Sequence, residues 1–187
     1  MLKLKAVNGH VEKLVKKRLV FSGNAVKFRA DAIRLPDGKP ATREFLDHPG
    51  AVAILPVLDD GGIVLVRQYR YPVGKVTLEI PAGKLHSSND SPVKRARAEL
   101  REETGYTAAR MNKLTAFWPT PAFSNELLHI YLATGLKAGK AAPDEDEFIK
   151  VEKMPFKKAL KLARNGQIKD AKTIIALQAY ALRNYEG

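Results

Sequence analysis

The chain of 187 residues is 45% hydrophobic and 28% charged, which is typical of a soluble globular protein of one domain, with room for a modest N-terminal addition. Because it has no cysteine and no apolar run of roughly 18 residues, we exclude a disulfide framework, a cysteine-based zinc site and a membrane span, and we expect a cytoplasmic protein. The net charge of +12 would attract a polyanion or a small phosphorylated substrate, but the chain has no RNA-binding aromatic pattern, zinc knuckle or basic zipper, so nucleic acid is not the expected partner.

Turn signals in the first half of the chain separate short extended segments. The Asp37-Gly38 pair predicts a hairpin between residues 25–34 and 41–50. The apolar segment 51–58, the turn "DDGG" and the segment 63–71 are interpreted as a buried antiparallel pair of strands. A further strand is expected over 76–83, interrupted by Pro81 and Gly83.

The first helix has clear boundary signals, and the second half of the chain continues the mixture of strands and helices. Ser91 suits the N-cap, Pro92 the first helical position and Gly105 the left-handed position after the last turn. We then expect two strands within 114–133, a strand over 148–155, and helices over 156–166 and 170–185. The predicted fold class is therefore α+β, with mixed sheets and helices against them, preceded by an N-terminal antiparallel β-hairpin segment.

Three glutamates gather on one turn of the first helix in an otherwise basic chain. Glu99, Glu102 and Glu103 share a helix face by their spacing, and like charges so placed weaken a helix unless a cation lies among them. Two cations compete for this role. One is supplied by arginines of the same helix, Arg95, Arg97 and Arg101, and the other is a divalent metal ion, for which carboxylates on a rigid face form a suitable half-site.

A family resemblance bears on this choice. The stretch "GKLHSSNDSPVKRARAELREETGY" resembles the Nudix box, with its leading glycine at Gly83 and its second half in register at Glu99, Leu100, Glu102, Glu103, Gly105 and Tyr106. The stretch also departs from the family pattern at two places. Ala98 stands where the family has an arginine, and Asp90 or Asn89 where it has its first glutamate, which leaves open what braces the helix and whether the first acid contacts metal.

The resemblance extends over nearly the whole chain and is closest to the ADP-ribose pyrophosphatase branch of the Nudix hydrolases, in which a proline lies about fifteen residues past the box, as Pro121 does here. It implies a Nudix α/β/α sandwich with a mixed β-sheet over residues 49–187. It also implies an N-terminal β segment, residues 1–48, exchanged between the subunits of a homodimer. The implied reaction is hydrolysis of nucleoside diphosphate sugars, with ADP-ribose giving AMP and ribose 5-phosphate.

The same resemblance implies the metal site and the base. Mg²⁺ or Mn²⁺ is expected on Glu99 and Glu103, on Glu102 directly or through a water, and on the backbone carbonyl of Ala82. Within the acidic loop "PDEDEF", Glu147 is expected as the general base or a further metal ligand, and Glu145 is the second choice. Without the resemblance, an acidic segment of this kind would be interpreted as a solvent-exposed loop.

Four further residues resemble substrate contacts of the family, and a purely structural role is the alternative explanation. Arg70 suits bidentate phosphate binding but could instead pair with an acid on the sheet. Arg43 and Glu79 resemble binding positions, and Phe28 could stack on the base or belong to a core. Three alternatives remain open: another nucleotide sugar such as GDP-mannose, removal of pyrophosphate from RNA 5′ ends, and a catalytically silent binding module.

Overall fold

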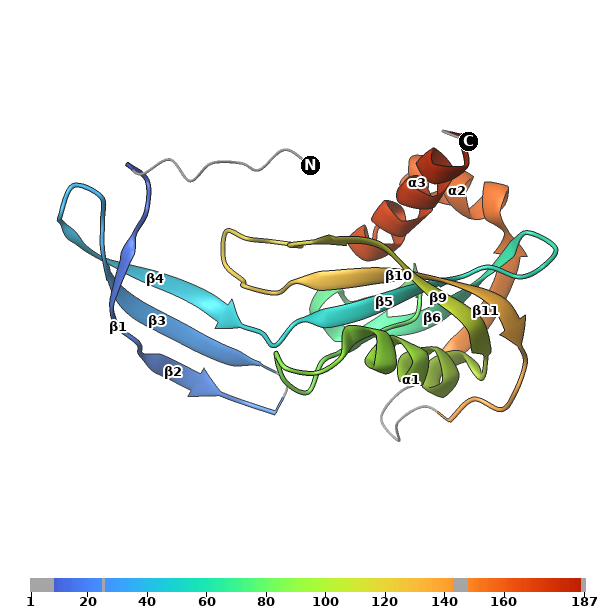
Figure 1. Cartoon of the computed structure of the whole chain (residues 1–187), viewed down its shortest axis with the longest axis horizontal. Coiled ribbons are helices and arrows are strands. Elements are labelled where there is room, and N and C mark those ends of the chain that lie inside the picture. Colours follow the sequence, from blue (N-terminus) through green and yellow to red (C-terminus); the bar gives the residue numbers. More distant parts are fainter. Residues whose placement is uncertain (1–8, 25, 143–147, 186–187) are drawn as a thin grey trace. The chain divides into compact units, whose positions relative to one another are not determined.

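The computed structural model describes residues 9–24, 26–142 and 148–185 (Figure 1). The chain divides into two compact units, one of Met1–His48 with Thr120–Glu126, the other of Pro49–Pro119 with Leu127–Gly187. Helices and strands are mixed along the chain, which confirms the predicted α+β class. Among the described residues, no helix is both long enough and apolar enough to cross a membrane.

The first unit contains an antiparallel sheet built around one long strand. Its strands are β1 (Lys13–Lys16), β2 (Leu19–Ser22), β3 (Lys27–Arg34) and β4 (Pro40–Asp47). β4 pairs with the full length of β3, while β2 and β1 pair with the first and second halves of its other edge. Gly38 has a φ of +88° in the β3–β4 turn, where a glycine is favoured, and the predicted hairpin is confirmed. The segment Thr120–Glu126 joins this unit through a bond from the Leu46 N–H to the Phe123 carbonyl (2.8 Å).

In its described residues, the second unit contains two sheets and three α-helices. The first sheet has the order β8-β5-β10-β9 and is mixed, because β5 and β10 are parallel while the other pairs are antiparallel. The second sheet is antiparallel, with the order β11-β6-β7. The elements are β5 (Ala51–Pro56), β6 (Gly62–Arg70), a short 3₁₀ turn η1 (Tyr71–Val73), β7 (Lys75–Glu79), β8 (Ala82–Lys84), α1 (Pro92–Thr104), β9 (Thr107–Phe117), β10 (Leu128–Lys137), β11 (Lys150–Pro155), α2 (Phe156–Arg164) and α3 (Ala171–Tyr185).

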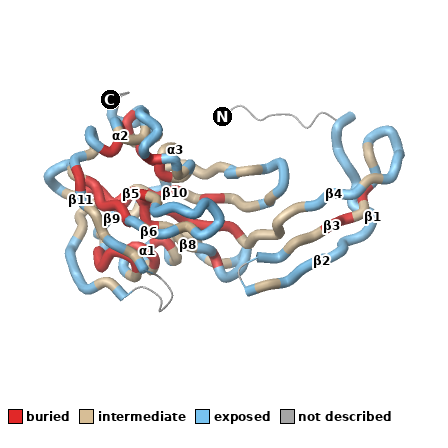
Figure 2. Tube along the Cα trace, turned by 180° about the vertical axis from the view of Figure 1, so that it is seen from behind, coloured by how far each residue is buried: buried red, intermediate tan, exposed pale blue. Residues whose placement is uncertain are grey.

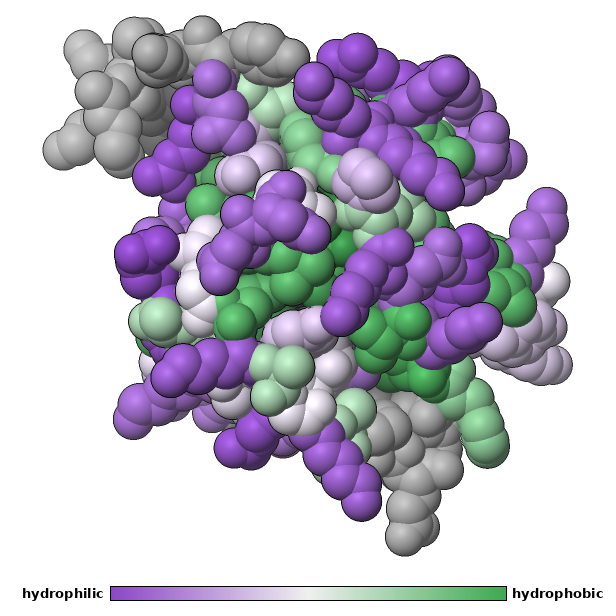
Figure 3. Space-filling view, turned by 90° about the vertical axis from the view of Figure 1, so that its right-hand side faces the viewer, coloured by the Kyte–Doolittle hydropathy of each residue, from purple (hydrophilic) through white to green (hydrophobic). Residues whose placement is uncertain are grey.

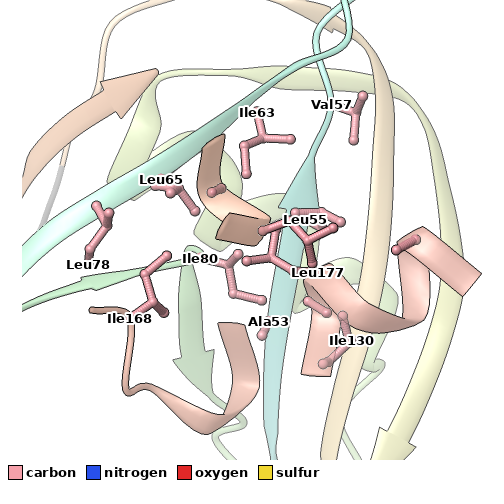
Figure 4. Close-up of a cluster of buried hydrophobic side chains, with 14 of the residues drawn as sticks. Ala53, Leu55, Val57, Ile63, Leu65, Leu78, Ile80, Ile130, Ile168 and Leu177 are labelled. Atoms are coloured by element: carbon pink, nitrogen blue, oxygen red, sulfur yellow. The ribbon is translucent and has the colours of Figure 1, made fainter. Parts of the chain in front are cut away.

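The core of the second unit lies on both faces of β5. Ala53 and Leu55 belong to one buried cluster with Leu177 of α3, while Val52 and Ile54 belong to another that includes Leu100 of α1. Figure 4 shows the first cluster, and Figure 2 shows the concentration of buried residues along these strands. A strand covered on both faces needs apolar side chains at successive positions, which explains the uninterrupted sequence "AVAILP". Helices α1 and α3 thus lie on opposite faces of the first sheet, which confirms the predicted α/β/α layers.

The expected antiparallel pairing of 51–58 with 63–71 is wrong. β5 lies between β8 and β10, and β6 lies between β11 and β7 in the other sheet. Only an isolated bridge from Val57 to Ile63 joins the two segments beside the turn. The turn was recognised correctly, but both edges of β5 pair with strands that are distant in the sequence.

The strand expected over 76–83 is divided between the two sheets. β7 ends at Glu79 in the second sheet, and β8 begins at Ala82 in the first. Pro81 lacks the N–H that a continuous ladder would need, which suits the point where the chain changes sheets.

On the side of the molecule shown in Figure 3, hydrophilic side chains cover much of the surface, with apolar side chains exposed between them.

Candidate active site

Helix α1 presents two of its three clustered glutamates to the protein interior. The helix begins after Ser91 and ends at Gly105, whose φ of 76° is the predicted left-handed conformation. Ala96 and Leu100 are fully buried in the core beneath it. Glu99 and Glu103 are each only 4% exposed, and Glu102 is partly exposed at the flank of this face. The predicted boundaries of the helix are confirmed, and its acidic face packs against the protein.

Strand β8 receives these two buried carboxylates. The N–H of Ala82 donates to Glu103 Oε2 (3.2 Å). Glu99 lies so close to Gly83 that a Cβ at that position would be 1.4 Å from Glu99 Oε1. A side chain at position 83 would therefore occupy the place of the carboxylate, which gives the glycine of "PAG" a direct steric reason.

The backbone of β8 also directs a carbonyl away from its neighbouring strand. Ile54 donates its N–H to the Pro81 carbonyl (2.9 Å), and Ala82 is in register with Ala53 one position further. Bonded and non-bonded pairs alternate in an antiparallel ladder, so the N–H and carbonyl of Ala82 both face away from β5. β8 is an edge strand, and the Ala82 N–H donates to Glu103 on its free side.

Arg95 lies among the glutamates. Its Nη2 pairs with Glu99 Oε1, and its Nη1 lies 3.3 Å from Glu102 Oε2. Neutralisation by an arginine of the same helix, one of the two alternatives from the sequence, is therefore present in the structure. Arg97 instead donates to the Ala108 carbonyl (2.7 Å), and Arg101 is exposed.

The donors at this site fit a hard divalent cation. They are carboxylate oxygens on a rigid helix and a backbone carbonyl at a sheet edge, the oxygen ligands that Mg²⁺ prefers. Across residues 9–24, 26–142 and 148–185, no three His, Asp or Glu side chains converge as a complete metal cage. Since Mg²⁺ usually keeps waters and binds substrate phosphates, two buried carboxylates with Glu102 beside them are suited to a half-site.

The two departures from the box have different structural consequences. Asp90 closes the loop before α1: it accepts the N–H groups of His86 (2.7 Å) and Ser87 (3.0 Å) and the Ser87 hydroxyl (2.9 Å). The Ser87 hydroxyl and these backbone donors lower the pKa of Asp90. Ala98 has no polar group to offer the glutamates, whereas Arg95 contacts two of them, Glu99 and Glu102.

A second polar cluster surrounds Glu79 at the end of β7. Glu79 is 2% exposed and accepts Arg70 Nε (2.9 Å) and Nη2 (2.7 Å), the Thr77 hydroxyl (2.5 Å) and Lys172 Nζ. Burial raises the pKa of Glu79, but the bonds from Arg70, Lys172 and Thr77 outweigh it and lower the pKa from 4.5 to about 2. Both predicted binding residues, Arg70 and Glu79, are thus partners of each other.

The residues that the start of α3 contributes to this cluster were missed by the sequence interpretation, as was Thr77. Asp170 precedes α3 and accepts the N–H and the hydroxyl of Thr173 (3.0 and 2.5 Å), while Lys172 Nζ bridges Asp170 and Glu79. The Thr173 hydroxyl in turn accepts the N–H of Ile80 (2.8 Å), which Figure 4 shows inside the core. The N-cap signal "DAKT" could have identified Asp170 and Thr173, but not their contact with β7.

A cavity of about 660 Å³ opens beside the Glu79 cluster. Its volume is in the range of small-molecule sites in proteins. Glu79 occupies the Nε and Nη2 edge of the Arg70 guanidinium, so the Nη1 edge faces away from Glu79. The cavity is lined by both basic and apolar side chains: Arg70, Pro72, Val73, Lys75, Val76, Thr77, Leu78, Glu79, Gln167, Lys169, Asp170 and Ala171.

Comparison with known proteins identifies the family. A model of the NUDIX domain matches residues 47–177, which include α1, β8 and the Glu79 cluster. The chain belongs to the NUDIX family. The resemblance inferred from the box is therefore confirmed, and the helical glutamates lie within the matched region of this NUDIX protein.

The relatives of this NUDIX chain include proteins whose names refer to nucleotide sugars. It is 42% identical over 174 residues to an ADP-ribose pyrophosphatase of Bacillus subtilis (strain 168), covering 92% of the chain and 94% of the relative. It is 36% identical over 146 residues to a GDP-mannose pyrophosphatase of Yersinia enterocolitica, covering 73% and 75%. A solved structure titled as an ADP compounds hydrolase matches 93% of both chains with a TM-score of 0.78 at 20% identity, which supports the same fold.

The remaining predicted site residues of this NUDIX protein lie elsewhere in the chain. Arg43 is exposed on β4 and pairs with Glu12 through Nε (2.9 Å) and Nη2. Phe28 is half-buried on β3, in register with Phe21 and Leu46. Both belong to the first unit. Glu145 and Glu147, the predicted bases, lie outside the described residues.

Proposed function

We propose that this NUDIX hydrolase cleaves the diphosphate bond of nucleoside diphosphate sugars, with ADP-ribose as the first candidate and AMP and ribose 5-phosphate as products. The observation that carries the proposal is the pair of buried carboxylates, Glu99 and Glu103, held against Ala82 and Gly83 within the family's matched region. Support for the substrate class comes from the 42% identical relative named as an ADP-ribose pyrophosphatase.

The proposed metal half-site consists of Glu99 and Glu103, with Glu102 and the Ala82 carbonyl as further donors, and it would hold Mg²⁺ or Mn²⁺. Once bound, such a cation would neutralise charge on the phosphates and would lower the pKa of a water in its shell. The chain's own contribution is to hold the two buried carboxylates at fixed positions on α1, because Gly83 leaves room for Glu99 and the Ala82 N–H orients Glu103.

Arg70 is proposed to orient the anionic substrate. Its position in the cavity wall and its pairing with Glu79 fix the guanidinium before any ligand arrives, which limits the ordering entropy lost on binding. Glu79 is therefore proposed to act through Arg70, since its carboxylate already accepts Arg70, Lys172 and Thr77. Lys75 and Lys169 in the same wall add positive charge that favours a phosphorylated ligand.

Glu147 remains the proposed general base or further ligand, with Glu145 as the second choice, because in the branch that the chain resembles a glutamate just before the following strand reaches the metals, and Glu147 holds that position in the sequence. Glu102 is the described carboxylate that could take over this role, since it is partly exposed beside the half-site. A positioned carboxylate that accepts a proton from the attacking water contributes about 10² to 10⁴ to the rate.

GDP-mannose is the second candidate substrate, because a 36% identical relative is named for it. A panel of nucleotide sugars assayed with Mg²⁺ and with Mn²⁺ ranks the candidates. We expect hydrolysis of ADP-ribose that EDTA abolishes and added metal restores. Full activity in excess EDTA would contradict the metal half-site. If the protein hydrolysed a 5′-triphosphate RNA but no nucleotide sugar, the proposed substrate class would be wrong and RNA would take its place.

Glu103→Gln tests whether turnover needs the carboxylates of α1. The substitution keeps the size of the side chain and removes its charge, so we expect kcat to fall by about 10²-fold or more while the protein stays folded. Asp59→Asn in the exposed β5–β6 turn removes a carboxylate away from the half-site and serves as the control. Parent-like turnover by Glu103→Gln at limiting metal would favour the silent binding module.

Homodimerisation with exchange of the first unit is proposed from the same resemblance. It is supported by the large apolar side chains that β1 and β2 expose, among them Leu14, Val15, Leu19, Val20 and Phe21. Light scattering during size-exclusion chromatography should give the mass of two chains. Val15→Glu should shift it towards one chain, whereas an unchanged mass for the variant would remove these strands from the interface.

A further inference from the structure

Arg95 contacts the same carboxylates that form the proposed metal half-site. It lies one helical turn before Glu99, and its two terminal nitrogens reach Glu99 Oε1 and Glu102 Oε2. The Arg95 side chain is 22% exposed and that of Glu99 is 6% exposed, so solvent screens their attraction only partly. One guanidinium thus contacts two carboxylates and offsets part of the repulsion between them.

The orientation of Arg95 is set by these two carboxylates. Within the described residues, the Nε of Arg95 is buried without a hydrogen-bond partner, although a guanidinium is most stable when all its buried donors are paired. The contacts with Glu99 and Glu102 therefore hold the side chain in a position that leaves its third donor group unsatisfied. This residual cost makes the arrangement easier to exchange for another cation.

The contacted oxygen of Glu99 is also the atom nearest to Gly83. A Cβ at position 83 would lie 1.4 Å from Glu99 Oε1, the same atom that pairs with Arg95 Nη2. Arg95 therefore binds Glu99 on the side that faces β8, where the half-site lies. Its other nitrogen, Nη1, lies 3.3 Å from Glu102 Oε2, so the same side chain also occupies an oxygen of the third glutamate.

We propose that Arg95 is the counter-cation of the metal-free glutamate cluster, and that a divalent cation and Arg95 compete for Glu99 and Glu102. The inference rests on the proposed metal half-site. Linkage is reciprocal, so a contact that stabilises the metal-free protein must weaken metal binding by the same factor if the metal displaces it. Removing Arg95 should consequently destabilise the metal-free protein and tighten metal binding.

The test uses Arg95→Met, which keeps much of the apolar stem and removes the charge. Thermal unfolding of the full chain is followed in EDTA and then during a titration with MnCl₂, without substrate. We expect Arg95→Met to unfold at a lower temperature than the parent in EDTA. Its Mn²⁺ midpoint, the dissociation constant fitted to the rise of the unfolding temperature with Mn²⁺ concentration, should be about tenfold lower than that of the parent, within the usual range of such couplings.

Arg101→Met is the matched control, since Arg101 is an exposed arginine on the same helix. It should leave the Mn²⁺ midpoint unchanged, which separates local competition from a change in net charge. If Arg95→Met fails to fold, Arg95→Lys is used in its place. Lysine keeps the positive charge but has a single nitrogen, which cannot reach both carboxylates as the guanidinium does. The Mn²⁺ midpoint of Arg95→Lys should therefore also fall, by a smaller factor.

The outcomes distinguish this inference from the proposed function. An Mn²⁺ midpoint that is unchanged or raised in the Arg95 variant would overturn the competition and make Arg95 a brace of the half-site. An equal shift in Arg101→Met would also overturn it. If the parent shows no stabilisation by Mn²⁺ at any concentration, the metal half-site itself fails, and with it the basis of this inference.

Discussion

Replacing Gly83 with alanine would put a methyl group where the Glu99 carboxylate lies. The added Cβ would be 1.4 Å from Glu99 Oε1, 2.0 Å from Cδ and 2.7 Å from Oε2, whereas ordinary contacts begin at 3.4 Å. The backbone of Gly83 does not have a positive φ, so alanine is conformationally allowed there and the effect is steric. The carboxylate must therefore move by about 2 Å to restore contact distances.

A displacement of this size should disrupt the proposed half-site. A misplacement of about 1 Å can cost 10²-fold in rate, so we expect kcat/KM for ADP-ribose to fall by at least about 10²-fold. The Mn²⁺ concentration that gives half-maximal activity should rise as well. Steady-state kinetics at several metal concentrations measure both quantities. Parent-like values of kcat/KM and of the metal midpoint would refute the placement of Glu99 against Gly83.

A double variant tests the steric reasoning separately from catalysis. Glu99→Asp shortens the side chain by one carbon, about 1.5 Å, which makes room for the alanine methyl. In the parent, Glu99→Asp should lower thermal stability, but in the Gly83→Ala background it should be neutral or stabilising. Such non-additivity is the expected sign of two groups in direct contact. Additive losses would show that Gly83 and Glu99 do not share this space.

Three further results are expected. Thr173→Val leaves the buried Ile80 N–H without its acceptor, so it should lower the free energy of unfolding by about 1–3 kcal/mol in denaturant titrations, while Thr173→Ser keeps the hydroxyl and should recover most of it. Because the folded-state pKa of Glu79 is lowered to about 2, its stabilisation is complete above pH 4.5 and is lost as the pH falls towards 2, so unfolding of Glu79→Gln should depend less on pH in that window. Glu147→Gln should lower kcat by about 10² to 10⁴ with a smaller change in KM, and Glu145→Gln should lower it much less; the reverse order of kcat effects would exchange their roles.

The local features of the site could be predicted from the sequence. Pro92 and Gly105 act through backbone conformation within a few residues, so the bounds of α1 followed from the residues themselves. The spacing of Glu99 and Glu103 places them on one helix face whatever the rest of the chain does. The box pattern then indicated the family, which the match over 47–177 confirmed.

The sequence did not determine which strands pair or which charges meet. The "DDGG" turn predicted that 51–58 would pair with 63–71, yet β5 lies between β8 and β10, because strand partners are chosen by competition among all sheet edges and by burial on both faces. Lys172 reaches Glu79 across 93 residues, a contact that no local pattern encodes. The sequence by itself determined the helix, its carboxylates and the glycine beside them. Only the tertiary structure decided that Glu99 packs on Gly83, that Arg95 lies between two glutamates, and that α3 holds the end of β7, because each of these depends on how distant segments come together.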